Sequence, residues 1–510
     1  MLVGEATRRA SEAAIVYEEA GAFELKGKAE PVPLWRAQRV VAAIRGGQRA
    51  VGLEAPFVGR DRELRMIKEL FHTTTDRGTA QLVSVVGPAG IGKSRLVWEF
   101  FKYMDGLADD TRWHRGRCLA YGEGVTYWAL AEMVRTNADI LEGEETASAL
   151  PKLRIAVENA IPDPEERKWV EPRLASLLGL ESSLTRDRED LFAAWRLFYE
   201  HLADVMPTVM VFEDIQWADA SMLDFIEYLL EWSRDHRLFV LTLARPEIAE
   251  RRPNWGTGKR SVTSIYLDPL PEGSMDELLT GLVPGLPDEL SAKVLDRAEG
   301  IPLYAVETVR MLLDRGLVIE EGGAYRPAGA VGELEVPETL HGLIAARLDG
   351  LTAEERRLAQ DAAVVGKTFV KEALASVSGL PPETLEPLLS SLMRKEILTV
   401  QADPFSPERG QYAFLGDLVR WVAYETLSKK ERRARHIAAA GFLEASFEEE
   451  DVAEVVASHY LQAYEAAPDA PDSAEIRAKA RDGLARAGQR AASLGASGEA
   501  LRYFERAAEL

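Results

Sequence analysis

A glycine-rich run at residues 87–94 carries the clearest chemistry in this chain. It satisfies the pattern G-x-x-x-x-G-K-[ST], follows an apolar run at 82–86 and precedes a helical pattern at 95–104. Glycine lets successive backbone N–H groups point inward, and the following helix adds positive potential at its N-terminus. This arrangement predicts a phosphate-binding loop. The residues expected to contact a nucleotide are Gly87, Pro88, Ala89, Gly90, Ile91, Gly92, Lys93, Ser94 and Arg95.

Within this loop, Lys93 and Ser94 have separate expected roles. The Lys93 ammonium should reach the β and γ phosphates, and the Ser94 hydroxyl should ligate Mg²⁺. A second, acidic element should complete the metal site. Four apolar residues at 209–212 predict a buried central strand, from whose C-terminal end Glu213 and Asp214 emerge.

We expect Glu213 to hold Mg²⁺ through water and Asp214 to orient the attacking water, although the sequence leaves open which acid takes which role. Another apolar run, at 238–243, is followed by Arg245. A guanidinium at that strand end suits recognition of a γ phosphate, and a surface salt bridge explains it equally well. The predicted catalytic set is therefore Lys93, Glu213, Asp214 and Arg245, with Ser94 and Glu213 as the Mg²⁺ ligands.

The elements that must position these residues alternate between short apolar strands and helical spans through about residue 270. Runs at 82–86, 113–118, 209–212 and 238–243 predict a parallel sheet with helices on both faces. Residues 271–336 turn helical and end in a short hairpin near 317–325. Three helical stretches from 352 onward, with strands at 397–400 and 411–414, predict a winged helix.

The last residues are helical and rich in alanine. Their small residues fall at the offsets of one tetratricopeptide repeat, with the interhelix turn at 495–498. A repeat buries its apolar face against a neighbouring repeat, so we expect the natural protein to extend past residue 510. The expected domains are 1–42, a linker at 43–55, an α/β phosphate-loop domain at 56–270, a helical lid at 271–336, a winged helix at 337–440 and helical repeats at 441–510.

Composition restricts the classes of partner and compartment. The net charge of −22 repels a phosphate backbone, so nucleic acid is a disfavoured partner. The apolar runs are too short to span a membrane and the N-terminus lacks a secretory signal. One cysteine, Cys118, precludes an intrachain disulfide, which together with the missing signal predicts a cytoplasmic protein.

The ordered motifs resemble the STAND class of signalling ATPases, within the AAA-like P-loop group, over about residues 56–444. The matching segments are Phe57-Val58-Gly59-Arg60-Asp61-Arg62-Glu63, residues 117–123, residues 214–219 and Gly300-Ile301-Pro302-Leu303. The resemblance implies that the backbone around Val58, Gly59 and Arg60 lines the adenine and that Pro302 packs on it; a proline at a helix start explains Pro302 as well. Many relatives carry a histidine where this chain has Gly416.

A second resemblance concerns the N-terminus. Residues 3–7 and 23–36 are similar to the last forty residues of a class III adenylate/guanylate cyclase domain. The family's metal-binding aspartates would precede Met1, so cyclase activity is not expected of this chain alone. A small β module is the alternative interpretation.

These observations predict an ATP/ADP- and Mg²⁺-dependent signal-transduction switch, with slow ATP hydrolysis and a protein partner bound by the C-terminal helical repeats. Self-association stays open. One alternative is the regulatory ATPase part of a nucleotide cyclase whose catalytic core lies upstream. Another is a DNA-binding transcription regulator or initiator-like ATPase that uses the winged helix.

Overall fold

The computed structural model describes residues 2–4, 15–23, 32–40, 55–107, 111–119, 125–181, 187–258, 261–321, 324–328, 337, 339–401, 406–447 and 449–510. The predicted linker therefore lies outside the described residues except for Ala55. Residues 5–7 and 24–31 of the cyclase-like segments also lie outside them, as do residues 120–123 of the ATPase-like segment 117–123. All statements of absence below refer to the described residues.

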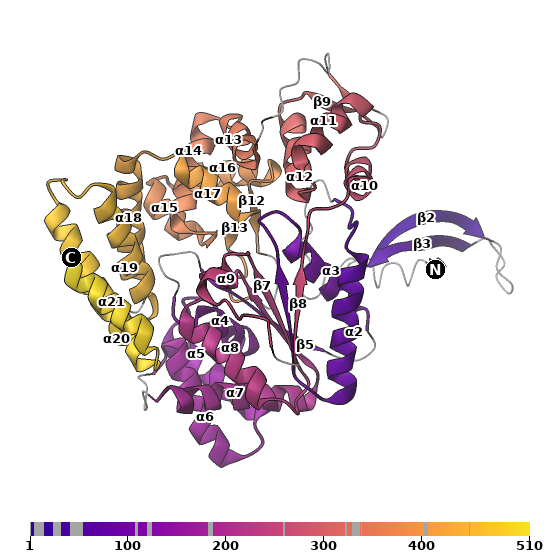
Figure 1. The fold of residues 1–510 in the computed structure, drawn as a ribbon. Coiled ribbons are helices and arrows are strands. Elements are labelled where there is room, and N and C mark those ends of the chain that lie inside the picture. The colour runs from indigo at the N-terminus through magenta and orange to yellow at the C-terminus, as the bar shows by residue number, and fades with distance from the viewer. Residues whose placement is uncertain are drawn as a thin grey trace.

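The N-terminal strands form an antiparallel sheet in the order β1-β3-β2. Its members are β1 (Leu2–Gly4), β2 (Ile15–Phe23) and β3 (Val32–Val40), drawn in indigo in Figure 1. Strands β2 and β3 pair along most of their length, and the pairing of β1 with β3 adds a third strand.

The central sheet has five strands in the order β5-β6-β7-β4-β8, and neighbouring strands are parallel. The strands are β4 (Gln81–Val86), β5 (Arg112–Arg117), β6 (Thr208–Glu213), β7 (Leu238–Ala244) and β8 (Val262–Tyr266). The first four were expected from their apolar runs, whereas β8 carries a mixed pattern that sequence analysis did not single out. Because the strands are parallel, their carboxyl ends meet at one edge of the sheet.

Helices cover both faces of this sheet, as predicted (Figure 1). Alternate residues of β4, β6 and β7 pack against different apolar clusters, which is the period-two pattern of a strand buried on both sides. One face holds α2 (Asp61–Arg77) and α3 (Lys93–Asp105). The other holds α4 (Trp128–Asn137), α5 (Thr146–Ala160), α6 (Pro164–Leu178), α7 (Arg188–Val205) and α8 (Ala220–Trp232). Short helices η1 (Ile215–Trp217) and α9 (Ile248–Arg251) follow β6 and β7.

A helical unit follows β8. It contains α10 (Glu272–Leu282), α11 (Asp288–Ala298) and α12 (Pro302–Asp314), which share one apolar cluster. The predicted hairpin is confirmed as the antiparallel pair β9 (Val318–Glu321) and β10 (Ala324–Pro327).

The next segment, called the small-sheet unit here, packs helices around an antiparallel sheet of order β11-β13-β12. Its strands are β11 (Thr368–Phe369), β12 (Leu398–Val400) and β13 (Tyr412–Phe414). Its helices are α13 (Leu340–Asp349), α14 (Ala353–Val365), α15 (Lys371–Ser378), α16 (Pro382–Arg394) and α17 (Asp417–Glu425). The two strands predicted here are present, and β11 joins them.

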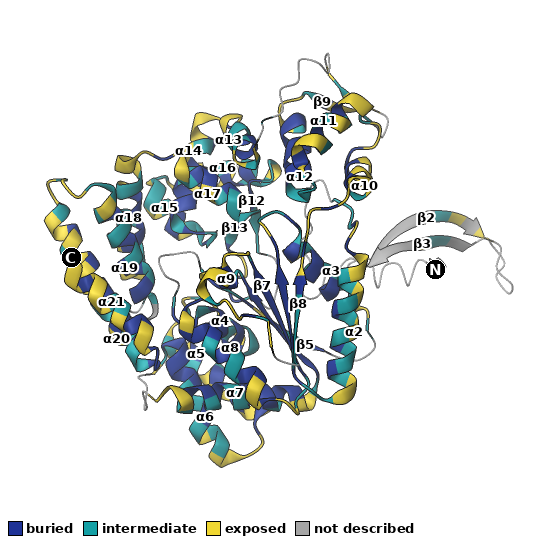
Figure 2. Ribbon diagram, viewed as in Figure 1, coloured by how far each residue is buried: buried dark blue, intermediate teal, exposed yellow. Residues whose placement is uncertain are grey.

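Four helices complete the chain and are called the C-terminal helices: α18 (Lys429–Ser446), α19 (Glu449–Ala466), α20 (Ser473–Ser493) and α21 (Ser497–Glu509). Helix α18 runs through position 440, where the sequence placed a domain boundary. Figure 2 shows that the inner faces of these helices are buried while yellow, exposed residues face outward. None of the described helices is long and apolar enough to cross a membrane.

Gly116 marks the tightest approach of a helix to the sheet. A Cβ atom on Gly116 would lie 2.0 Å from the carbonyl oxygen of Ala129, which is backbone and cannot rotate away. We therefore expect Gly116→Ala to lower the free energy of unfolding by about 3 kcal/mol or more. Thermal unfolding followed by circular dichroism measures this effect.

Gly441→Ala is the matched control, because a Cβ there meets nothing within 4 Å and Gly441 lies inside α18. That variant should keep or raise the midpoint temperature of unfolding. Helix propensity alone favours alanine over glycine by about 1 kcal/mol. Equal midpoints for the two variants would contradict the close packing of α4 on β5.

Candidate functional site

The predicted phosphate-binding loop connects β4 to α3 at the carboxyl edge of the central sheet. Gly90 and Gly92 have φ angles of 79° and 103°, a region open to glycine and strained for other residues. The Gly87 N–H donates to the carbonyl of Ala244 at 3.2 Å, which fixes the start of the loop against the end of β7. Helix α3 begins at Lys93, so its first N–H groups face the loop.

Lys93 is folded over this loop. Its Nζ donates to the carbonyls of Gly87 at 2.6 Å and Pro88 at 2.9 Å. Burial lowers the pKa of Lys93 to about 8, with Asp214 acting to raise it and Arg245 to lower it further. Lys93, Asp214 and Arg245 therefore lie near enough for their charges to interact.

Glu213 ends β6 and is 5% exposed. Arg115, on the neighbouring strand β5, donates to Glu213 Oε2 at 2.9 Å. Burial acts to raise the pKa of Glu213, but the Arg115 guanidinium outweighs it and holds that pKa below its usual range. Glu213 is therefore a carboxylate at neutral pH, with an ion-pair partner that the sequence did not reveal.

Asp214 follows directly and has a φ of 57°, in the left-handed region. Burial and the charge of Asp417 raise its pKa. Gln216 links this acid to β7: its Nε2 donates to Asp214 Oδ1, and its Oε1 accepts from the backbone N–H of Arg245, both at 3.0 Å. Gln216 lies within the ATPase-like segment 214–219, and its role depends on contacts that the sequence does not reveal.

The donor atoms suit a magnesium ion. Ser94 is exposed at the start of α3, which follows β4, and Glu213 and Asp214 supply carboxylate oxygens at the end of β6, on the other side of β7. Mg²⁺ usually takes one or two protein carboxylates together with water and phosphate oxygens, so this oxygen set fits it. The described residues hold no cluster of three or more His, Cys, Asp or Glu that would bind a metal without a phosphate partner.

The helical unit meets the loop at its tip. The Leu303 N–H, in the first turn of α12 beside Pro302, donates to the carbonyl of Gly90 at 3.2 Å. A Cβ on Gly90 would lie 2.8 Å from the Cβ of Leu303, so only glycine permits this contact. Ile301 packs against apolar clusters of both the helical unit and the α2–α3 face.

Residues 58–60 also join the core to the helical unit. Val58 belongs to the apolar cluster of α10–α12. A Cβ on Gly59 would lie 2.7 Å from the Oγ of Ser274 in α10, so α10 packs closely on this segment. Arg60 donates to the carbonyl of Asp268. Val58, Gly59 and Arg60 therefore lie where the helical unit meets the core; their contact with adenine stays a prediction.

The small-sheet unit reaches the opposite side of the site. Arg117, at the end of β5, pairs with Glu408 at 3.3 Å, and Glu408 accepts from Thr368 at 2.7 Å. Lys367 pairs with Asp417 at 3.0 Å. Gly416, at the position where relatives carry a histidine, is the N-cap residue of α17 and immediately precedes this Asp417.

Two buried carboxylates come from the C-terminal helices. Glu499 accepts from the Ala220 N–H at 3.0 Å and the Ser221 Oγ–H at 2.6 Å, at the start of α8. Glu454 accepts from the N–H and the Oγ–H of Thr126, both at 2.8 Å. Since α8 begins a few residues after Asp214, the end of the chain contacts the element next to the acidic pair.

A pH dependence follows from the lowered pKa of Lys93. The nucleotide-free protein should lose the Lys93 proton as pH rises through about 8, and a bound phosphate retains that proton. ATP affinity should therefore be full below pH 8 and fall above it, by up to about tenfold per pH unit. Calorimetric titrations between pH 7 and 9.5 measure the effect.

Lys93→Arg is the control, because guanidinium keeps its charge throughout this range. Its ATP affinity should change little with pH. A wild-type dissociation constant that stays constant from pH 7 to 9.5 would contradict the assignment of Lys93.

Residues 56–241 match the AAA ATPase domain family. An uncharacterised protein of Rhizobium meliloti (strain 1021) is 25% identical over 467 residues, which cover 86% of this chain and 42% of that protein. The chain thus spans less than half the length of this curated relative.

Two solved structures are among those similar to this chain. One is a Signal Transduction ATPase with Numerous Domains (STAND) protein with a tetratricopeptide repeat sensor from Pyrococcus horikoshii, with TM-score 0.49 and 16% identity over 90% of this chain and 60% of that one. The other is Drosophila ORC bound to DNA, with TM-score 0.32 and 14% identity over 73% of this chain and 88% of that one. From the family match, residues 56–241 of this chain form an AAA ATPase domain.

Proposed function

We propose that this protein is a nucleotide-dependent signalling switch that binds ATP or ADP with Mg²⁺ and hydrolyses ATP slowly. The observation that carries the proposal is that three separate units contact the rim of one site. Leu303 of the helical unit bonds to Gly90, Glu408 of the small-sheet unit pairs with Arg117, and Glu499 caps α8. A change at the nucleotide can therefore alter three sets of contacts.

In this proposal the loop N–H groups and Lys93 bind the β and γ phosphates. When a nucleotide enters, Lys93 exchanges its bonds to the carbonyls of Gly87 and Pro88 for phosphate oxygens. Ser94 and Glu213 would hold Mg²⁺, which neutralises phosphate charge when bound. Asp214 orients the attacking water and Gln216 fixes the Asp214 carboxylate, while Arg245 contacts the γ phosphate. Because this chemistry needs only positioning and charge, slow hydrolysis is consistent with it.

The energetics of such a switch are modest. Reversing a 1:99 equilibrium needs roughly 5.5 kcal/mol of differential binding. A hydrogen bond to a charged group contributes about 1.5 to 3 kcal/mol, so two or three contacts to the γ phosphate suffice. Lys93, Arg245 and the metal ligands supply that number.

We assign the small-sheet unit as a winged helix that acts inside the switch. The basic run at 429–435, which the expected winged-helix range 337–440 includes, lies at the start of α18, where Arg435 is paired with Asp361 and Arg433 with Asp472. These intramolecular pairs, with the net charge of −22, argue against the alternative of a DNA-binding regulator. The alternative of a cyclase regulator rests on the N-terminal resemblance alone.

We assign α20 and α21 as a tetratricopeptide repeat that receives a protein partner. The two helices pack closely, since a Cβ on Gly488 would lie 2.8 Å from the Phe504 ring. Leu501 on α21 is 57% exposed, as expected of a repeat face that a further repeat or a partner covers.

Lys93→Ala should abolish measurable ATP and ADP binding, weakening it at least about 100-fold, because two or more charge-assisted bonds are lost. Calorimetry with magnesium present measures this. Lys102→Ala is the matched control on the same helix, where Lys102 pairs with Glu99. Unaltered ATP affinity in Lys93→Ala would refute the site.

Asp214→Asn should lower the rate of ATP hydrolysis by about 100-fold or more while leaving ATP affinity within a few fold, since the amide cannot accept a proton. Steady-state phosphate release measures the hydrolysis rate. Asp204→Asn, at an exposed position in the last turn of α7, is the control. Wild-type turnover in Asp214→Asn would remove Asp214 from catalysis.

A further inference from the structure

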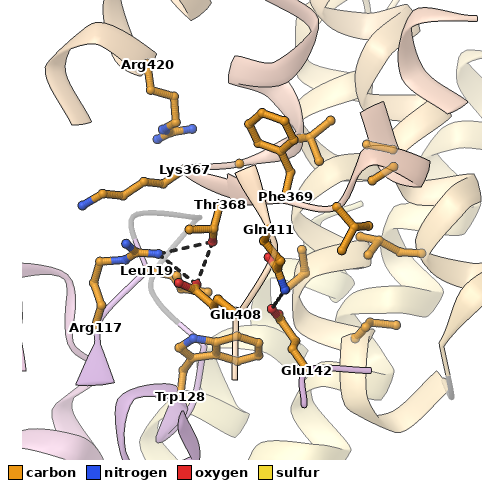
Figure 3. A pocket seen from close by; sticks show the side chains of 18 of the residues that line it. Arg117, Leu119, Trp128, Glu142, Lys367, Thr368, Phe369, Glu408, Gln411 and Arg420 are labelled. Atoms are coloured by element: carbon orange, nitrogen blue, oxygen red, sulfur yellow. Dashed lines mark hydrogen bonds and ion pairs between the residues drawn. The ribbon is translucent and has the colours of Figure 1, made fainter. Parts of the chain in front are cut away.

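A cavity of about 450 Å³ lies where the AAA domain, the small-sheet unit and the C-terminal helices meet (Figure 3). Its walls include Asp214 and Arg245, but none of the loop residues 87–94 lines it. It therefore adjoins the nucleotide site at Asp214 and Arg245 and extends away from the loop. Its volume falls within the range of about 300–1,000 Å³ that is usual for small-molecule sites, and such sites favour domain interfaces.

One part of the wall is apolar. The small-sheet unit contributes Val370, which precedes α15, and Ala373 and Val377 within α15. The C-terminal helices contribute Phe442 of α18 and Val455 of α19. These side chains belong to two different units, so an apolar body placed between them would contact both. Burying such a body releases about 25 cal/mol for each Å² of apolar surface.

The other part carries basic groups. In Figure 3, Arg117, Lys367 and Arg420 lie on one side of the cavity, away from the unlabelled apolar sticks. Arg135 and Arg245 also line it. The basic side chains come from β5, β7, α4 and the small-sheet unit, and Arg420 and Arg135 donate to the carbonyls of Ala363 and Leu178.

The acidic side chains of the wall are fewer, and each already accepts a hydrogen bond from the protein. Glu142 accepts from Gln411 at 2.8 Å, Glu408 from Thr368, Asp417 from Lys367 and Asp214 from Gln216. Burial raises the pKa of Glu142, and Glu408 raises it further, which reduces the negative charge of this wall. Lys367 and Arg117 donate to two of these acids, and five basic against four acidic side chains leave the wall with an excess of positive charge.

We propose that this cavity binds a small amphipathic anion, with a carboxylate at the basic side and an aliphatic body between α15 and the α18–α19 pair. The head group meets Arg420 and Lys367, and the body fills the space beside Val377. Because three units form the wall, the anion binds only the arrangement in which they meet. It therefore stabilises that arrangement, and this regulatory consequence rests on the proposed switch.

Calorimetric titration of the full chain with decanoate, in the absence of nucleotide, tests binding by itself. We expect saturable one-to-one binding of decanoate and at least tenfold weaker binding of decanol, which has the same chain without the charge. No saturation with decanoate would overturn the proposal, and equal affinity for decanol would overturn the assignment of an anionic head.

Two variants locate the ligand. Val377→Phe should weaken decanoate binding at least tenfold by filling the apolar part, while Val205→Phe, the same change at an exposed position, should not alter it. Arg420→Gln should weaken decanoate binding about tenfold without changing decanol binding. This variant also tests the proposal if Val377→Phe does not fold. Wild-type decanoate affinity in folded Val377→Phe or in Arg420→Gln places the ligand elsewhere and overturns the proposal.

A last titration separates this inference from the proposed function. Lys93→Ala, which should not bind ATP, should bind decanoate as the wild type does, because Lys93 is not part of the cavity wall. Loss of decanoate binding in that variant would show that the two sites are one, and would overturn the separate cavity. Loss of ATP binding with decanoate binding retained supports it.

Discussion

The parallel register of β6, β7 and β4 is the constraint on which the rest of the structure depends. Val86 pairs with Ala244, and Phe212 with Thr242, so the phosphate loop, the acidic pair and Arg245 all leave the sheet at one edge. Residues far apart in the sequence thereby lie close enough for their charges to interact. Burial lowers the pKa of Lys93, and the nearby charges act on it in opposite directions, Asp214 raising it and Arg245 lowering it.

The same edge is where the other units attach. The helical unit contributes the Leu303 N–H, the small-sheet unit contributes Glu408 and the Lys367–Asp417 pair, and the C-terminal helices contribute Glu499. A buried carboxylate that loses the backbone N–H groups it accepts from is left unpaired, which costs free energy. Movement of a whole unit is therefore favoured over partial loosening of one contact. This gives the proposed switch a discrete rather than graded character.

Local sequence predicted the parts of the site that are contiguous in the chain. The loop 87–94 and the Glu213–Asp214 pair could be recognised from their residue types and spacing. The strands that precede them, β4 and β6, could be recognised because they are apolar. Strands β8 and β11 were missed because one is partly polar and the other has two residues.

Pairings between distant residues could not be predicted. Arg115 and Glu213 meet through strand register, and Glu454 and Glu499 reach their partners across more than 270 positions. From a single sequence, a helical glutamate that makes such a buried contact looks the same as one that is exposed to solvent. The winged helix and the repeat are proposals that rest on the order of elements and on residue spacing, and the cyclase-like segment is a proposal that rests on resemblance.

The central claim is that the γ phosphate changes the contacts at the rim of the site. Hydrogen exchange of the backbone amides of Leu303, Thr126 and Ala220, whose N–H groups bond to Gly90, Glu454 and Glu499, measures those contacts directly. With saturating Mg²⁺ nucleotide, the account predicts different protection of these amides with a non-hydrolysable ATP analogue and with ADP. Identical protection with both nucleotides would contradict it.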